Sequence, residues 1–503
     1  MAKPTSPITR LAQGSILCAI ALGVMPLLQF LLVQGAPVFS DHGISPVIFF
    51  TLKQALLSTM LSVVMGIGVA RALARQSFAG KALFLRLLAL PMAMPAIVAV
   101  LGLVSLFGNS GLFPGFIPLY GFWGIVLAHV FFNLPMCVRM FYQALGNAPE
   151  EGFKLAAQLN LGERAIFRHV EWPALRPVIA RGAALVFLLC AASFVIALSF
   201  GGASATTLEV AIYQSLRLDF DIPRALQLSL VQVVLSLSLI GLVAHMFDAA
   251  ALTFSLRQTA RFRPRPRTGS IVFDWCLIAI AGLLVLPVVI AVFATGLGAL
   301  HFSALTFQAL GTSLALGFAS ASLALLLALP LARAADTASH LVSLAAMILP
   351  PAVMATGWFV LLQGLPDSAA LSALLIVLLN GLVALPYAAA TMTSGFLKIT
   401  PAHDKLSAQL GLTSLVRWRI VDFPLLRTQL AQAFLMGMVT SLGDLTAIML
   451  FGTHGIITLP SLQQAEMGHY RGHEAAGTAA LLLLLCGALT FAAQHWGERH
   501  DPT

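Results

Sequence analysis

Ionisable side chains are rare in this sequence, and many of them lie in two short, related segments. Only 9% of the 503 residues are charged. Residues 150–176 read EEGFKLAAQLNLGERAIFRHVEWPALR, and residues 405–427 read KLSAQLGLTSLVRWRIVDFPLLR. Aligned without a gap from Lys154 and Lys405, the two segments are identical at 11 of 23 positions. A repeat of this kind indicates two copies of one structural unit with a shared task.

Residue types that support catalysis or nucleotide binding do not occur here at the required spacing. There is no H-E-x-x-H, no pair of carboxylates at catalytic spacing and no serine–lysine arrangement. A phosphate-binding G-x-x-x-x-G-K-[ST] loop is also excluded, because no Ser or Thr follows Gly80-Lys81. His454, His469 and His473 lack a carboxylate or cysteine at ligand spacing. We therefore predict that the chain is not an enzyme and holds no metal and no cofactor.

Each charged segment is instead expected to present a short amphipathic helix. Pro149 suits a first helical position, and Glu150 and Glu151 complement the positive end of the helix dipole. Leu155 and Leu159 lie four residues apart and form an apolar stripe. Such a stripe with charged flanks is shaped to dock in a groove of a partner protein. The alternative is a connection that packs on its own helix bundle, but two copies favour a partner.

The second copy repeats the stripe with Leu406 and Leu410. Each helix is predicted to end at Asn160 or Gly411, the residue types that best tolerate a left-handed end conformation. A second short helix is expected to follow and to end at the E-W-P or D-F-P sequence. In the first copy, the predicted docking residues are Glu150, Glu151, Lys154, Leu155, Ala156, Ala157, Gln158, Leu159 and Asn160. In the second copy, they are Asp404, Lys405, Leu406, Ser407, Ala408, Gln409, Leu410 and Gly411.

The remaining chain has the composition of a membrane protein. It is 59% hydrophobic with a mean hydropathy of +0.94, and its few charges cannot cover a water-facing surface. Continuous apolar runs of about 20 residues favour helices over barrel strands. We predict an all-α, polytopic protein in the lipid bilayer with about twelve spans. They lie near 13–34, 49–71, 84–107, 120–143, 179–202, 226–248, 272–297, 306–332, 341–364, 370–393, 430–452 and 475–492.

The basic residues predict the orientation of these spans. With the N-terminus inside, 24 of the 28 lysines and arginines fall in cytoplasmic segments, so both termini are predicted to be cytoplasmic. The charge is spread over loops without an aromatic stacking platform, which excludes nucleic acid as a partner.

An arginine- and proline-rich segment divides the spans into two groups of six. Residues 255–270 contain five arginines and two prolines, a composition that favours a cytoplasmic linker. We predict a first half over 1–254 and a second half over 271–503. Parallel repeats imply a pseudo-twofold axis along the membrane normal, with a pathway between the halves.

Ionisable residues within spans are candidates for function. Asp444 follows Ser441 in the eleventh span, where the first half has Ser193. These three residues are predicted to line a substrate pathway in which Asp444 attracts a cation. The alternative for Asp444 is a residue near a helix end that hydrogen-bonds its neighbours. Seven charged residues are expected to edge the outer face as contacts for a binding protein: Glu209, Arg217, Asp219, Asp221, Arg224, Glu466 and Arg471.

The repeated segment is similar to the EAA loop of permease subunits in binding-protein-dependent ABC importers, a pattern written E-A-A-x-x-x-G, nine residues, I-x-L-P. In both copies the closing proline lies 13 positions after Asn160 or Gly411. The resemblance covers essentially the full length. It is closest to the fused, two-in-one permeases of the thiamine and ferric-iron group, because SLGDLTAIMLFG (441–452) and TLPSLQQAEMGHYR (458–471) resemble the thiamine type.

The resemblance implies the membrane permease of an ATP-driven importer in a bacterial inner membrane. Two ATPase subunits would bind ATP and each grip one loop, while an extracytoplasmic binding protein delivers a small solute such as thiamine or ferric iron. The pattern departs from the family at Lys154 and Lys405, which replace the motif glutamate, and at Asn160, which replaces its glycine. These departures put a glutamate-mediated contact in doubt and allow the two halves to couple unequally.

An ion-coupled secondary transporter with twelve spans is the alternative function. Such a transporter is expected to carry ionisable residues through its core spans, whereas Asp444 stands nearly alone here.

Overall fold

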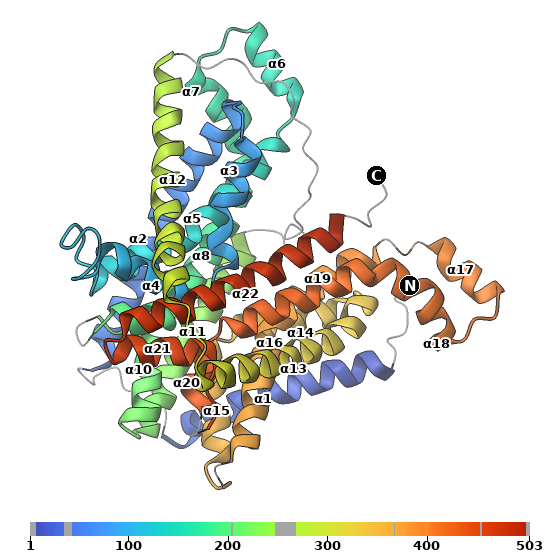
Figure 1. Cartoon of the computed structure of the whole chain (residues 1–503). Helices are drawn as coiled ribbons and strands as arrows, with labels where there is room; N and C mark the ends of the chain where they lie inside the picture. The colour runs from blue at the N-terminus through green and yellow to red at the C-terminus, as the bar shows by residue number, and fades with distance from the viewer. Residues whose placement is uncertain are drawn as a thin grey trace.

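The chain folds into helices throughout the residues that the structure describes. In this computed structural model those residues are 7–34, 43–202, 205–246, 268–366, 368–397, 399, 401–452 and 455–498 (Figure 1). No strand occurs among them, which confirms the predicted all-α class. Nine of the described helices are long and apolar enough to cross a membrane. They are α1 (Pro7–Gln34), α2 (Ile44–Arg75), α5 (Phe122–Gly146), the continuous helix 163–191 that ends in α8 (Trp172–Ala191), α11 (Ile222–Met246), α12 (Thr268–Gly296), α13 (Ala304–Ala334), α16 (Ala369–Phe396) and α22 (Gly472–Glu498).

Two predicted spans are broken at prolines. Span 84–107 consists of α3 (Lys81–Leu88) and α4 (Ala96–Phe107), bent by 110° across the segment that contains Pro91 and Pro95. Span 341–364 likewise consists of α14 (Thr337–Ile348) and α15 (Pro351–Leu362). A proline removes a helical hydrogen bond and disfavours helical geometry in the residue before it. Hydropathy does not reveal these breaks, because the sequence stays apolar across them.

Two further spans are interrupted near one end. Span 179–202 combines the end of α8 with α9 (Val195–Phe200), and span 430–452 combines α19 (Phe423–Leu442) with α20 (Thr446–Phe451). Both breaks fall at corresponding places in the repeat. The predicted linker 255–270 lies outside the described residues except for its last three, which belong to the start of α12.

The first helix of each half packs on the other half. α1 lies against α13, α14 and α15, and α12 lies against α2, α3 and α4. The indole Nε1 of Trp358 in α15 donates to the carbonyl oxygen of Ala19 in α1, at 3.0 Å. A Cβ at Gly357 would lie 1.7 Å from the carbonyl oxygen of Gly23, so only glycine permits this close approach. The two halves of the sequence are therefore interlocked in space.

The two charged loops lie at the ends of separate arms of the molecule. In Figure 1 the first loop is at the top, near α6, and the second is at the right, near α17. The arms meet where α15 contacts α10 (Leu208–Tyr213) and α11, and where α4 contacts α21 (Leu459–Gly468). This arrangement places the two predicted docking helices far from the junction of the halves.

Candidate functional site

The leucine stripes of both loops are exposed. α6 (Glu150–Gln158) leaves 55% of Leu155 and 61% of Leu159 accessible, and α17 (Pro401–Gln409) leaves 55% of Leu406 exposed, with 63% of Leu410 exposed just beyond the helix. These side chains are apolar, repeated in both loops and more than half exposed. Such exposure costs free energy in water, so it favours a protein partner over the alternative of packing on the chain's own bundle.

Two of the predicted docking residues face inward instead. Ala156 is buried beside Phe153 and Ile166, and Ser407 is buried at the corresponding position of α17. Both lie on the side of the helix away from the leucines. In this structure they position the docking helix on its own half, and the stripe that a partner can reach consists of the leucines alone.

Both helices end in the predicted left-handed conformation. Asn160 has φ 49° and Gly411 has φ 61°. The N–H of Leu161 donates to the carbonyl of Ala156, and the N–H of Leu412 donates to the carbonyl of Ser407 in the same way. These bonds close a Schellman motif in each copy. The prediction for the two helix ends is confirmed, and Asn160 performs the same conformational task as the glycine.

The charged residues of the two helices differ between the copies. Lys154 Nζ lies 3.0 Å from Glu150 Oε1, an exposed i,i+4 pair within α6. Glu151, Ala157 and Gln158 are exposed beside it. In the second copy Lys405, Ala408 and Gln409 are exposed, and the side chain of Asp404 lies outside the described residues.

The second helix of each loop does not end at its proline, contrary to the prediction. α7 (Glu163–Ile166) passes through a π-helical turn (Phe167–Glu171) directly into α8, and α18 (Ser414–Arg417) passes through Trp418–Asp422 into α19. Pro173 and Pro424 fall in the first turn of α8 and α19. A proline has no N–H to donate, and here it closely follows the π-helical turn. In that turn the N–H of Trp172 donates to Phe167, and in the second copy that of Phe423 donates to Trp418, each five residues back. This local change of the hydrogen-bond pattern accommodates the proline within the continuous helix.

Each π-helical turn ends in a buried carboxylate paired with an arginine from the second span of its half. Arg71 Nε at the end of α2 donates to Glu171 Oε2 at 2.5 Å, and the Arg71 guanidinium lies 4.7 Å from the centre of the Phe167 ring. In the second half, Arg333 Nη1 lies 3.3 Å from Asp422 Oδ2, an ion pair without aligned hydrogen-bond geometry. Glu171 and Asp422 are both almost fully buried. We call these two pairs the loop clamps.

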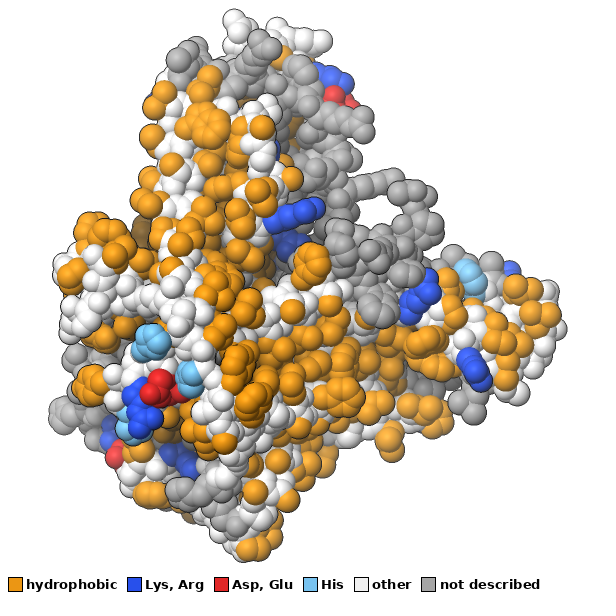
Figure 2. All heavy atoms as spheres, in the orientation of Figure 1, with side chains coloured by type: hydrophobic (Ala, Val, Ile, Leu, Met, Phe, Trp, Pro, Cys, Tyr) orange, Lys and Arg blue, Asp and Glu red, His pale blue; other side chains and the backbone are white. Residues whose placement is uncertain are grey.

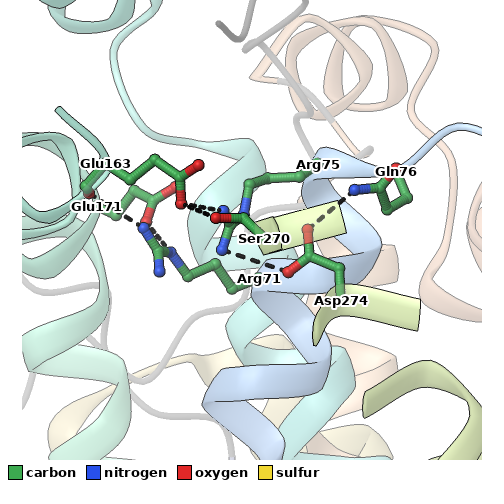
Figure 3. A network of polar contacts seen from close by, with 7 residues as sticks. All are labelled: Arg71, Arg75, Gln76, Glu163, Glu171, Ser270 and Asp274. Carbon is green, nitrogen blue, oxygen red and sulfur yellow. Dashed lines mark hydrogen bonds and ion pairs between the residues drawn. The ribbon is translucent and has the colours of Figure 1, made fainter. Parts of the chain in front are cut away.

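A wider network joins the first loop to α12 (Figure 3). Arg75 Nη1 lies 3.0 Å from Glu163 Oε2, and Arg75 Nη2 lies 3.3 Å from Asp274 Oδ1 in α12. Ser270 Oγ donates to Glu163 Oε2 at 2.7 Å, and Gln76 Nε2 donates to Asp274 Oδ2 at 2.9 Å. On the other side, α1 contacts the second half through Gln13, whose Nε2 donates to Ser339 Oγ at 3.0 Å.

The predicted pathway residues lie at the helix breaks. Asp444 accepts the backbone N–H of Thr446 at 3.1 Å and of Ala447 at 2.9 Å, so its carboxylate stabilises the start of α20. Asp444 is therefore a residue near a helix end that hydrogen-bonds its neighbours, which was the alternative to a role in attracting a cation. Ser441 accepts from Asn380 Nδ2 at 3.0 Å, and Ser193 lies in the corresponding break between α8 and α9.

Two residues expected on the outer face are buried instead. Glu209 in α10 (Leu208–Tyr213) is fully buried, and neither of its carboxylate oxygens has a hydrogen-bond partner among the described residues. Glu466 is 6% exposed. The prediction that Glu209 touches a binding protein at the surface is therefore wrong for this structure. Local sequence does not show its burial, because the helices that cover it are distant in the chain.

Glu209 is expected to make the fold less stable as the pH rises. Burial raises the pKa of Glu209 from 4.5 to about 8. The folded chain therefore holds this proton more tightly, and the resulting stability is present below pH 4.5 and is lost as the pH rises through 8. The melting temperature of the purified chain should fall as the pH rises over this range, and the decrease should be smaller in Glu209→Gln. The exposed Asp219→Asn is the control, and its melting temperature should decrease with pH as that of the wild-type chain does. An equal slope in Glu209→Gln and the wild-type chain would contradict the prediction.

Known proteins with similar sequences include a permease family and several full-length relatives. The family described as "Binding-protein-dependent transport system inner membrane component" matches residues 62–251. The thiamine transport system permease protein of Brucella abortus is 39% identical, over 88% of this chain and 85% of the relative. That of Escherichia coli is 39% identical over 89% of this chain and 88% of the relative, and that of Salmonella typhimurium is 38% identical over 97% of both.

Proposed function

Because this chain belongs to the permease family of binding-protein-dependent ABC importers, we propose that it carries thiamine inward across the inner membrane. It is a multi-pass inner membrane protein and a transport permease. Its long apolar helices can cross a membrane, and its full-length relatives are transport permeases. The observation that carries the coupling part of the proposal is the pair of exposed leucine stripes on α6 and α17. The substrate rests on the relatives, whose names specify thiamine transport.

One ATPase subunit docks on each loop in this proposal. Leu155 and Leu159 fill an apolar groove of one subunit, and Leu406 and Leu410 fill the same groove of the other. ATP is bound and hydrolysed by those subunits, since this sequence has no phosphate-binding loop.

The loop clamps carry the movement of the ATPase subunits into the membrane. Arg71 connects the first loop to α2, and Arg333 connects the second loop to α13. Asp274 extends the first connection to α12, so pulling on the first loop also moves a helix of the second half. With both termini in the cytoplasm, a binding protein releases the solute on the opposite face, into a pathway near Ser193, Ser441 and Asp444.

Reconstitution tests the proposal. Proteoliposomes are prepared with the chain, its ATPase and its solute-binding protein, and uptake of labelled thiamine is measured. We expect uptake that requires ATP and all three proteins, that persists without a proton gradient and that does not occur with ferric iron. Uptake by the chain alone, driven by a proton gradient, would instead identify an ion-coupled secondary transporter. ATP-driven uptake of iron but not thiamine would overturn the substrate assignment and leave the coupling part intact.

A further inference from the structure

A group of metal-ligating side chains lies in the second half, away from the docking helices, and the transport mechanism does not use it. His301 follows α12, Glu466 lies in α21 (Leu459–Gly468), and Glu474 lies in the first turn of α22. One ligand atom from each residue lies within 4.8 Å of the other two. Figure 2 shows histidine, acidic and basic side chains gathered in one place on a largely apolar face, near the position of α21 in Figure 1. We propose that His301, Glu466 and Glu474 bind a divalent cation of the zinc type.

His301 is held with one ring nitrogen toward the two carboxylates. Its Nδ1 lies 3.3 Å from the carbonyl oxygen of Ala299, and that oxygen can only accept a hydrogen bond. The proton of the neutral imidazole therefore belongs on Nδ1, and Nε2 presents a lone pair. Nε2 lies 3.8 Å from Glu466 Oε1, too far for a hydrogen bond. Two ligands of one tetrahedral zinc ion lie about 3.3 Å apart, so the ligand atoms of the group, which lie within 4.8 Å of one another, would have to close by up to about 1.5 Å on binding.

Glu466 is positioned by a second hydrogen bond. Thr478 Oγ1 donates to Glu466 Oε2 at 2.8 Å, which leaves Oε1 facing His301. Outer hydrogen bonds of this kind orient the ligands of metal sites. Burial raises the pKa of Glu466, and a positive ion would offset the cost of holding this carboxylate charged away from water.

Glu474 leaves the group open on one side. Its side chain is 45% exposed and lies 3.4 Å from Nη1 of Arg471, whose side chain is 64% exposed. An exposed pair of this kind contributes little, so Arg471 can give way to an ion. Solvent can then supply the remaining ligand, as water does in zinc sites with three protein ligands.

A glycine permits the approach that forms the group. A Cβ at Gly477 in α22 would lie 2.2 Å from the carbonyl oxygen of Ala299, the acceptor that orients His301. Any side chain at position 477 would push the segment between α12 and α13, which contains Ala299 and His301, away from α22. A bound ion would connect this segment to both α21 and α22. The sequence alone does not reveal the group, because His301 is distant from the other two ligands in the chain.

Zinc titration of the full-length chain tests the proposal. The chain is purified with a tag that contains no histidine, treated with EDTA and titrated with Zn²⁺ by calorimetry. We expect one ion per chain. His301→Ala and Glu474→Gln should each weaken binding at least tenfold, and Thr478→Val should weaken it by about 10- to 100-fold through loss of ligand orientation.

The exposed His469→Ala is the matched control and should bind zinc as the wild-type chain does, because His469 lies outside the group. Zn²⁺ should also raise the melting temperature of the wild-type chain and of His469→Ala but not of Glu474→Gln, which gives a result even if His301→Ala does not fold. No binding by the wild-type chain overturns the proposal. The proposal is also overturned if His469→Ala loses zinc binding while Glu474→Gln retains it, because the zinc would then be bound by surface histidines.

Discussion

Replacing Leu155, Leu159, Leu406 and Leu410 with aspartate is expected to release the ATPase subunits and abolish ATP-driven transport. Each leucine is more than half exposed in the isolated chain and would become buried on docking. Full burial of a fully exposed leucine side chain contributes about 1.5–3 kcal/mol, so burying the exposed 55–63% of the two leucines in one loop contributes roughly 2–3.5 kcal/mol. Loss of that amount weakens each contact by about 30- to 300-fold, and an aspartate must also be desolvated. Co-purification of the ATPase with the tagged chain measures the effect.

Methionine at the same four positions is the matched control. It keeps the apolar surface and should retain the ATPase and transport, because swaps that conserve volume are tolerated. Membrane insertion should be unchanged in both variants and the melting temperature should change little, since more than half of each leucine side chain lies outside the chain's own packing. Undiminished ATPase yield with the four aspartates would refute docking through the stripes. Variants changed in only one loop show whether the two copies couple equally.

Features set by neighbouring residues could be predicted from the sequence. The left-handed ends at Asn160 and Gly411 follow from residue type and position, and the structure confirms both. The leucine spacing correctly predicted one exposed stripe per loop. Local reasoning failed at Pro173 and Pro424, where a stop was expected and a π-helical turn carries the helix onward. A proline is compatible with both outcomes, and packing of the loop on its own half decides between them.

Features that depend on distant segments were not predicted. The exchange of α1 and α12 between the halves leaves no local signal, because an apolar helix can pack on any apolar neighbour. The buried state of Glu209 and the pairing of Arg71 with Glu171 depend on tertiary contacts in the same way. The repeat aligns Glu171 with Asp422, and the predicted spans 49–71 and 306–332 each end at or directly before an arginine, Arg71 or Arg333. An acid and a base repeated together in both halves are the signal that could have suggested the loop clamps.

Breaking one loop clamp is expected to destabilise the chain and disconnect ATP hydrolysis from transport. Arg71→Met leaves Glu171 buried without its arginine, and removing one partner of a buried ion pair costs about 3–5 kcal/mol. The melting temperature should fall by several degrees. In the double variant Arg71→Met, Glu171→Met, no charge is left uncompensated, and stability should largely return because apolar replacements of buried pairs are often neutral.

The double variant then separates a structural role of the clamp from its role in transmitting movement. Its docking helix is intact, so the ATPase should still bind and hydrolyse ATP. Transport per ATP should fall at least tenfold, because the Arg75–Glu163 ion pair, which then remains between α2 and the loop, has a less buried carboxylate than the clamp. Arg86→Met, which removes a cation from α3 without touching the clamp, is the control and should transport normally. If the double variant regains both stability and full transport, the clamp only stabilises the fold. If stability returns without transport, the Arg71–Glu171 pair is the connection through which the ATPase moves the membrane helices of the first half.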